Sequence, residues 1–257
     1  METLDHTPLW IDLDGAVNAR AVVPGVLLRS DNLQGLSPAD VRTLIDDHGL
    51  EVVLDLRTGT EAHSEGPGPL TREPAVRIEH RSMYPEQGNT DVDIDSVIRW
   101  ETPHDEALVD ESPTVRAYMG YVNRRPDSVA ESVRAIARTK GAVLVHCAAG
   151  KDRTGTVVAV ALDAAGWDRE AIVADYLATD QRIEQILERL RSSETYRAEL
   201  EGHSAAQHAP VPGAIERVLE LIDLQYGGSV RFLLENGLDE SDIAALRERL
   251  GGGPAPE

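Results

Sequence analysis

Short runs of apolar residues alternate with longer amphipathic segments along the chain. The runs that are rich in Val and Leu and have the length of strands are Val26–Arg29, Val52–Leu56, Val76–Ser82 and Val143–His146. The second and the last of these are continuously apolar, which is typical of parallel strands that are buried on both faces. The pattern therefore predicts an α/β fold with a mostly parallel central sheet of about four or five strands, flanked by helices.

Helix start and stop signals mark the segments between and after these strands. Ser37 supplies an N-cap, Pro38 occupies the first helical position and Gly49 supplies a stop. Ser112 and Pro113 repeat this start. Such signals and amphipathic spacing predict the other helices: a segment from Pro113 to about Arg138 that breaks near Pro126, a buried apolar helix from Arg153 to Gly166, Arg169–Ala178, Asp180–Arg191, Ala214–Gln225, Val230–Glu235 and Ser241–Leu250.

Three segments lack a regular pattern. Gln87–Glu111 is rich in Asp and Glu, and Ser192–Gly213 has little periodicity and contains two prolines. We expect each of them to be a solvated loop or a lid over a binding site. The tail over residues 251–257, G-G-G-P-A-P-E, is expected to be disordered.

The chain is strongly acidic. Its 257 residues include 45 acidic and 25 basic side chains, which gives a formal net charge of −20. This charge argues against binding to nucleic acid and against stable binding to anionic membranes, because both depend on clustered Lys and Arg. It leaves room for one local site that binds an anion.

The sequence lacks the features of a secreted, membrane-spanning or zinc-binding protein. Its first residues have no basic start followed by an apolar run, and no stretch approaches the roughly 18 apolar residues that a membrane helix needs. The single cysteine excludes an internal disulfide, and no C-x-x-C spacing for zinc occurs. We therefore expect a soluble cytoplasmic protein without a metal or another cofactor.

The cysteine lies in the segment H-C-A-A-G-K-D-R-T-G, His146 to Gly155, between a predicted strand and a predicted helix. A loop that enters a helix turns backbone N–H groups and the positive end of the helix dipole toward its centre, and both favour the thiolate of Cys147 and a bound anion. Arg153 adds a planar guanidinium that matches two phosphate oxygens, and Lys151 adds a second positive charge. Gly150 allows the backbone to approach a ligand. We expect this segment to bind a tetrahedral dianion above a nucleophile.

The segment resembles the signature loop of cysteine-based protein tyrosine phosphatases, Cys-x5-Arg. It is most similar to the loop H-C-x-x-G-K-D-R-T-G of the bacterial tyrosine/serine protein phosphatase family, whose members are PtpB-like enzymes of mycobacterial type. Three more pieces agree with this family in the same chain order: Pro24–Leu33, Val52–Glu61 and Ala174–Thr179. Where relatives tend to carry Asn-Phe-Arg-Asp, this chain reads V-N-A-R-A-V over Val17–Val22. The resemblance implies a cysteine-phosphatase-like fold with one phosphatase domain over residues 1–250.

The resemblance also implies the catalytic roles. Cys147 would attack a phosphomonoester in line and form a thiophosphate intermediate that water hydrolyses. Arg153 and the backbone N–H groups of the loop would bind the phosphate oxygens, with Thr154 donating a hydrogen bond to the thiolate. The loop residues that form this cradle are Ala148, Ala149, Gly150 and Lys151. His146 would order the loop, and Gly155 would allow close packing behind it.

Three carboxyl groups are candidates for the general acid that protonates the leaving group. Asp152 is the first choice because the family keeps an acid at this place in the loop. Asp55 is the second, since the ends of parallel strands face one crevice, and Asp110 is the third. Arg57 and Glu61 are expected to form a structural ion pair.

We therefore predict a metal-independent phosphatase of the protein tyrosine or dual-specificity type. Its substrate would be a phosphorylated protein, or in the alternative a small phosphate such as a sugar phosphate, a nucleotide or a phosphoinositide, for which Lys151 offers a second cation. Two further functions are compatible with such a loop, namely sulfur transfer of the rhodanese type and phosphate binding without turnover. The oligomeric state does not follow from the sequence.

Overall fold

The computed structural model of the chain describes residues 7–86, 108–202 and 204–251. In these residues, six strands form one sheet in the order β1-β2-β3-β6-β4-β5. β3, β6, β4 and β5 are parallel to one another, while β2 is antiparallel to both β1 and β3. The bounds are β1 Leu9–Trp10, β2 Arg20–Val23, β3 Leu27–Ser30, β4 Leu50–Asp55, β5 Arg77–His80 and β6 Ala142–His146. The predicted α/β fold with a mostly parallel sheet is confirmed.

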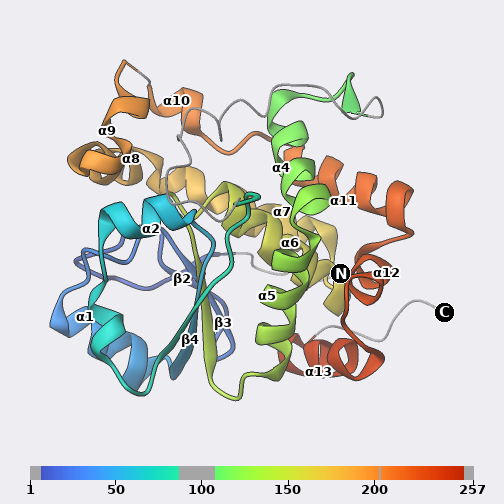
Figure 1. Cartoon of the computed structure of the whole chain (residues 1–257), viewed down its shortest axis with the longest axis horizontal. Coiled ribbons are helices and arrows are strands. Elements are labelled where there is room, and N and C mark those ends of the chain that lie inside the picture. The colour runs from blue at the N-terminus through green and yellow to red at the C-terminus, as the bar shows by residue number, and fades with distance from the viewer. Residues whose placement is uncertain (1–6, 87–107, 203, 252–257) are drawn as a thin grey trace.

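Helices lie on both faces of this sheet (Figure 1). Before β6 they are α1 Pro38–Arg42, which continues into a π-helical turn at Thr43–Asp47, α2 Gly59–Glu65, a 3-10 turn at Pro69–Arg72, α4 Pro113–Arg124 and α5 Pro126–Arg138. After β6 they are α6 Asp152–Ala165, α7 Arg169–Ala178, a 3-10 turn at Thr179–Arg182, α8 Ile183–Ser192, α9 Glu194–Leu200, α10 Ala205–His208, α11 Ala214–Tyr226, α12 Ser229–Glu235 and α13 Glu240–Leu250.

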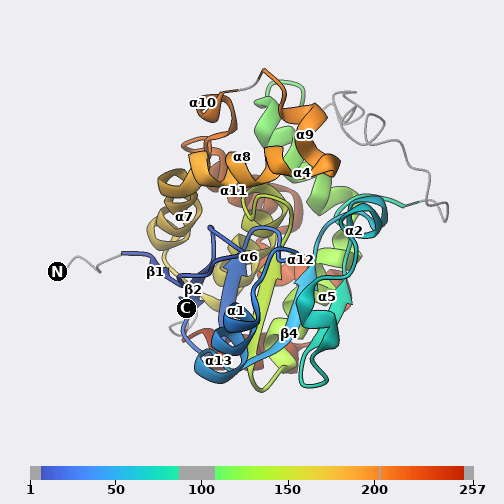
Figure 2. The ribbon, with the colours of Figure 1, turned by 90° about the vertical axis from the view of Figure 1, so that its left-hand side faces the viewer.

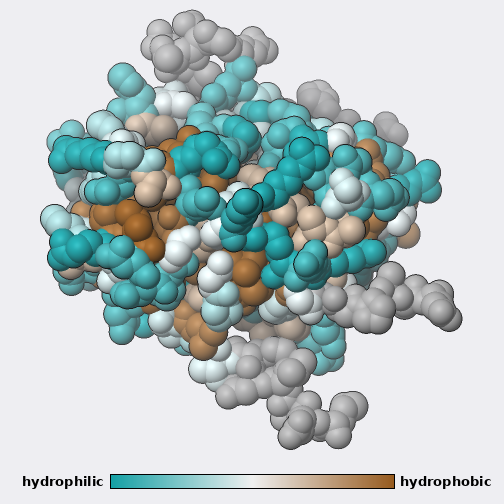
Figure 3. All heavy atoms as spheres, turned by 90° about the horizontal axis from the view of Figure 1, so that it is seen from below, coloured by the Kyte–Doolittle hydropathy of each residue, from teal (hydrophilic) through white to brown (hydrophobic). Residues whose placement is uncertain are grey.

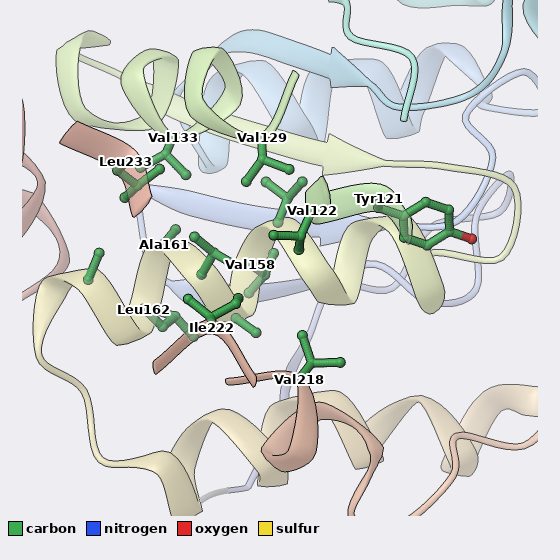
Figure 4. Packing of buried hydrophobic residues seen from close by; sticks show 14 of the residues in the cluster. Tyr121, Val122, Val129, Val133, Val158, Ala161, Leu162, Val218, Ile222 and Leu233 are labelled. Atoms are coloured by element: carbon green, nitrogen blue, oxygen red, sulfur yellow. The ribbon is translucent and has the colours of Figure 1, made fainter. Parts of the chain in front are cut away.

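Helix α6 is the centre of the larger core. Its residues are buried almost all round, as the apolar sequence predicts. Val122 of α4 and Val129 and Val133 of α5 pack on one side of it, and Ile222 of α11 packs on another (Figure 4). A second core lies on the opposite face of the sheet. Because α6 is fixed by packing along its length, its first turn holds the preceding loop in a defined position.

The local signals explain where the helices begin and end. Ser37 and Thr58 each accept a hydrogen bond from the backbone of the third helical residue, and that residue bonds back to the cap, which forms capping boxes at α1 and α2. Gly166 ends α6 in the left-handed conformation that favours glycine. The predicted break near Pro126 is confirmed, since α4 ends at Arg124 and α5 begins at Pro126.

Two features differ from the sequence-based expectations. The expectation of a loop over Ser192–Gly213 was wrong, since this segment contains α9 and α10. β1 and β2 were not predicted, because β1 has only two residues and β2 begins with a buried arginine. Residues 87–107 of the predicted lid Gln87–Glu111, and 252–257 of the predicted tail, lie outside the described residues.

Helices α8, α9 and α10 lie beyond the carboxyl ends of the parallel strands (Figures 1 and 2). Figure 3 shows the molecule from below the view of Figure 1, where hydrophilic residues predominate and hydrophobic residues form separate patches between them. Among the helices of the described residues, none has the length and apolar character that crossing a membrane requires.

Candidate active site

The signature loop joins β6 to α6 at the end of the sheet where the parallel strands have their carboxyl ends. β6 ends at His146 and α6 begins at Asp152, so Cys147 is the first residue of the loop. In the sheet register, His146 is paired with Ser30 of β3 and with Asp55 of β4. The carboxyl ends of three parallel strands therefore meet at Cys147, which is the usual place for a binding crevice in a parallel sheet.

Gly150 allows the loop to pass close to β3. Its φ is +67°, a conformation that residues with a side chain rarely adopt. A Cβ atom at this position would lie 2.3 Å from the carbonyl oxygen of Ser30. Gly150 is thus required because the loop lies close to the protein's own backbone, whereas the sequence suggested a close approach to a ligand. Gly155 is also tightly packed, because its Cβ would lie 3.1 Å from the ring of Tyr176.

Arg153 is held by Glu61 in a bidentate ion pair. Its Nη1 and Nη2 atoms lie 2.6 and 2.9 Å from the two Glu61 carboxylate oxygens. Both side chains are about nine-tenths buried, at 11% and 9% exposed. Burial alone would lower the pKa of Arg153, but Glu61 and the nearby Cys147 raise this pKa well above its usual value. The guanidinium therefore stays charged, and it has more N–H donors than the pair with Glu61 uses.

This pair corrects the expected ion pair between Arg57 and Glu61. Arg57 instead binds Asp55 through Nε at 2.9 Å and through Nη2 at 2.6 Å. Glu61 is free to face Arg153 because it lies in the first turn of α2, where its carboxylate also accepts the Thr58 N–H at 2.7 Å. The structure thus pairs Arg57 with Asp55 and Glu61 with Arg153, in place of the expected pair of Arg57 with Glu61.

Asp55 and His146 form a buried layer behind Cys147. The His146 Nε2 atom lies 3.6 Å from Asp55 Oδ1. Burial lowers the pKa of His146 to about 4, so the ring is neutral at pH 7. Burial alone would raise the pKa of Asp55, but His146 and the Arg57 guanidinium hold it far below its usual range. Asp55 is thus a carboxylate throughout the physiological pH range.

Asp152 stands at the partly exposed side of the loop, with 35% of its side chain accessible. The Tyr118 hydroxyl donates to Asp152 Oδ1 at 2.5 Å and is itself 2.9 Å from the Tyr176 hydroxyl. The Lys151 ammonium lies 3.4 Å from the same carboxylate oxygen and donates to the His208 carbonyl at 2.6 Å. The third candidate acid, Asp110, is exposed in the turn before α4.

Thr154 and Tyr84 complete the surroundings of the loop. The Thr154 hydroxyl is buried, and no hydrogen-bond partner for it is found within the described residues. The Tyr84 ring lies 5.5 Å from the Arg153 guanidinium carbon. In the part of the chain that the structure describes, no three His, Cys, Asp or Glu side chains are grouped as a metal site requires.

Glu61 and Tyr118 were not identified as site residues by sequence reasoning. Glu61 lies in the piece V-V-L-D-L-R-T-G-T-E that is shared with the family, and this could have marked it. Tyr118 lies in α4, 34 residues from its partner Asp152. Only the tertiary structure brings it to the loop.

Comparison with known proteins gives a consistent result. The family model described as the tyrosine phosphatase family matches residues 12–252. The triple specificity protein phosphatase PtpB of Mycobacterium tuberculosis is 30% identical, over 95% of this chain and 97% of its own length. A tyrosine-protein phosphatase of Nostoc commune is 28% identical, over 96% of this chain and 81% of its own length.

The resemblance inferred from the signature loop is therefore confirmed. The prediction of a protein tyrosine or dual-specificity phosphatase, a phosphoric monoester hydrolase, agrees with the family model and with both relatives. The residues that the family model matches include β2 to β6, the signature loop and the helices from α1 to α13. The chain belongs to the tyrosine phosphatase family.

Proposed function

We propose that the protein hydrolyses phosphomonoesters of proteins, phosphotyrosine first, through a covalent intermediate on Cys147. The observation that carries this proposal is the position of Arg153. It lies in the first turn of α6, six residues after Cys147, and its charge is secured by the buried Glu61. A guanidinium held at this distance along the loop can bind two phosphate oxygens while the sulfur faces the phosphorus.

In the first step the Cys147 thiolate attacks phosphorus, and the bond from phosphorus to the leaving oxygen breaks. Asp152 gives its proton to that oxygen. Water then attacks the thiophosphate, Asp152 takes up a proton from the water, and the sulfur leaves as a thiolate. The buried Thr154 hydroxyl, which has no hydrogen-bond partner among the described residues, is the donor that stabilises the leaving thiolate.

Asp152 is favoured over the other two carboxyl groups by its surroundings. Its side chain is partly exposed, so a bound substrate can reach it. Asp55 is buried and held as a carboxylate by Arg57, so it has no proton to give. Asp110 is exposed in a turn before α4. A general acid has to reach the leaving oxygen directly or through one water molecule.

The segment that follows α8 acts as a cover over this site. The His208 carbonyl binds the Lys151 ammonium, and the Val211 N–H lies 3.3 Å from the Tyr176 hydroxyl. Lys151 is therefore occupied as long as α10 stays in place. A substrate with a second phosphate would have to replace the His208 carbonyl, whereas a phosphotyrosine needs only the loop and Arg153.

The test is phosphate release in the presence of EDTA by the wild-type protein and by Cys147→Ser. The substrates are a phosphotyrosine peptide, a phosphoserine peptide, a phosphoinositide and a set of sugar and nucleotide phosphates. We expect the phosphotyrosine peptide to rank first and the substitution to reduce its turnover by at least about a thousandfold, because a hydroxyl is a far weaker nucleophile than a thiolate.

Three results would contradict the proposal. Equal turnover by Cys147→Ser would rule out the covalent mechanism, and loss of activity in EDTA would rule out a metal-independent one. A preference for a sugar or nucleotide phosphate would assign the enzyme to small-molecule metabolism. Circular dichroism of the variant provides the control that the fold is intact.

A further inference from the structure

Three consecutive carbonyl groups of the signature loop are bound from outside by one segment near the amino terminus. The Asn32 N–H donates to the Ala148 carbonyl at 2.9 Å. The Asn18 side-chain amide donates to the Ala149 carbonyl at 2.9 Å and to the Gly150 carbonyl at 3.3 Å. Arg29 Nη2 donates to the Gly150 carbonyl at 2.7 Å. None of the three donors belongs to the loop.

These bonds determine where the N–H groups of the loop point. A trans peptide unit is planar, and its N–H and C=O point in opposite directions. Carbonyls that face outward from residues 148, 149 and 150 therefore turn the N–H groups of residues 149, 150 and 151 toward the centre of the loop. Successive N–H groups that converge in this way form a concave site for an anion.

Asn18 and Arg29 are themselves fixed by a buried network. The Asn18 N–H donates to Asp31 Oδ1 at 3.0 Å, and its side-chain oxygen accepts Arg20 Nη1 at 2.6 Å. Arg20 Nε binds Asp175 Oδ1 at 2.9 Å, and Arg29 Nη1 binds the other oxygen of Asp175. Asn18, Arg20 and Arg29 are no more than 1% exposed. Each donor therefore has little freedom to turn away from the loop.

The network also places positive charge behind the loop. Arg20 and Arg29 share the carboxylate of Asp175, and Asp31, which accepts the Asn18 N–H, is paired with Arg189. These three arginines and two carboxylates leave a surplus of one positive charge. Burial and the charge of Arg29 lower the pKa of Arg20 to about 10, so the Arg20 guanidinium remains protonated at neutral pH. Arg29 Nε is buried and has no hydrogen-bond partner among the described residues. A buried charge of this kind is costly to the fold and favours an anion nearby.

We propose that Asn18 and Arg29 are positioning residues of the phosphate site, which hold the signature loop in its anion-binding form before substrate arrives. The expected effect on kcat and KM rests on the proposed phosphatase function. The expected effect on tungstate affinity needs only that the loop binds an anion. Neither residue touches the substrate. Their effect is transmitted through the carbonyl groups of Ala149 and Gly150.

A structural role without effect on the site is the competing explanation, and Arg249 provides the matched control. Its guanidinium also donates to backbone carbonyls, those of Ile136, Lys140 and Gly141, at 2.8 to 3.1 Å. Gly141 lies just before β6 begins, at the opposite end of that strand from Cys147. Loss of these three hydrogen bonds from Arg249 should lower stability without changing the signature loop.

The experiment compares Asn18→Ala, Arg29→Lys and Arg249→Lys with the wild-type protein. Urea unfolding gives stability, isothermal titration calorimetry with tungstate gives anion affinity, and hydrolysis of p-nitrophenyl phosphate gives kcat and KM. We expect Asn18→Ala to weaken tungstate binding about tenfold, as for the loss of one buried hydrogen bond. Arg29→Lys should lower kcat/KM by about 100-fold through displacement of the loop. Arg249→Lys should leave both within about twofold of wild type, since changes distant from the site act on stability alone.

The inference is overturned if tungstate affinity and kcat/KM of the Asn18 and Arg29 variants equal those of wild type, or if the three variants lose activity only in proportion to stability. If Asn18→Ala or Arg29→Lys fails to fold, Asn18→Ser takes its place, because it removes the carboxamide that donates to the loop without adding a charge beside the anion site. Its weakened tungstate binding would support the inference, and unchanged binding would overturn it. A wild-type protein that binds tungstate but hydrolyses no ester would overturn the proposed function and leave the positioning role standing.

Discussion

The first half of the signature loop, Cys147 to Gly150, is held by fully buried groups, whereas Asp152 in the second half is partly open to solvent. Asn18 and Arg29, which bind the first half, are 0% and 1% exposed. Asp152 is 35% exposed and accepts a hydrogen bond from a tyrosine of α4. The first half is thus built like a protein core, and the position of the proposed general acid is built like a protein surface.

This difference separates two kinds of substitution. A change in the first half should reduce stability and activity together, because the cage for the phosphate is part of the packed interior. A change at Asp152 should alter rates and substrate preference while the fold remains intact. Three measurements, each expressed as a free energy so that the sizes can be compared, test this separation.

The largest effect is expected from Gly150→Ala. The new Cβ would lie 2.3 Å from the Ser30 carbonyl in a backbone with φ of +67°. Clash and strain together should lower the free energy of unfolding by about 4 kcal/mol. Gly25→Ala is the control, because Gly25 has φ of +70° but no atom within 4 Å of its added Cβ. It should lose only about 1 kcal/mol. Similar losses for the two variants in urea unfolding would contradict a tightly packed first half.

The next effect is a pH dependence of stability that comes from His146, behind the first half. Its pKa is about 4 in the folded protein, against an ordinary value of 6.5 for a solvated histidine. Between these values the unfolded chain binds more protons, so stability falls as the pH is lowered. The loss should approach about 3 kcal/mol by pH 4. In His146→Gln this part of the slope should disappear, while the carboxyl groups common to both proteins contribute equally. Identical slopes of stability against pH for wild type and His146→Gln, from pH 7 to pH 4, would contradict this prediction.

The smallest effect in free energy is expected from Asp152→Asn, in the second half. Loss of the general acid should lower kcat about 100-fold for phosphoserine, which corresponds to about 2.7 kcal/mol of activation free energy. The loss should be smaller for p-nitrophenyl phosphate, whose leaving group needs no proton, and the unfolding free energy should stay near that of wild type. Asp110→Asn serves as the comparison. A greater loss of kcat in that variant would transfer the acid role to Asp110.

The parallel part of the sheet could be predicted because continuous apolar runs identify buried strands. β4 and β6 were found in this way, and β3 and β5 were predicted from apolar runs that contain charged residues. β2 was not predicted, since its first residue, Arg20, belongs to a buried polar network whose partner, Asp175, lies in α7. A charged residue inside a strand indicates exposure unless its partner is known. The short α9 and α10 were missed because seven and four residues give too few turns for a periodic pattern.

The candidate residues of the site are easier to select from the sequence than their supports. Cys147, Arg153 and Asp152 lie within one contiguous motif, so the local sequence is enough to select them as candidates. Glu61 binds Arg153 across 92 residues, and sequence proximity suggested Arg57 as its partner instead. In the sequence, Asn18 stands out only because it lies in the segment Val17–Val22, which departs from the family pattern. Pairings between distant segments depend on which strands become neighbours, and no local pattern records that.

The distance along the chain between the loop and its supports also affects how the protein is made. The bonds from Asn18 and Arg29 to the loop join residues that are 121 to 132 positions apart. During synthesis the amino-terminal segment emerges first, and the arginines in it have no carboxylate partner until Asp175 of α7 has been added. Contacts over such long separations form slowly. A nascent chain in which β6 has emerged but has not joined β3 therefore lacks the hydrogen bonds that fix the loop carbonyls, and the loop reaches its final form only when the two distant segments meet.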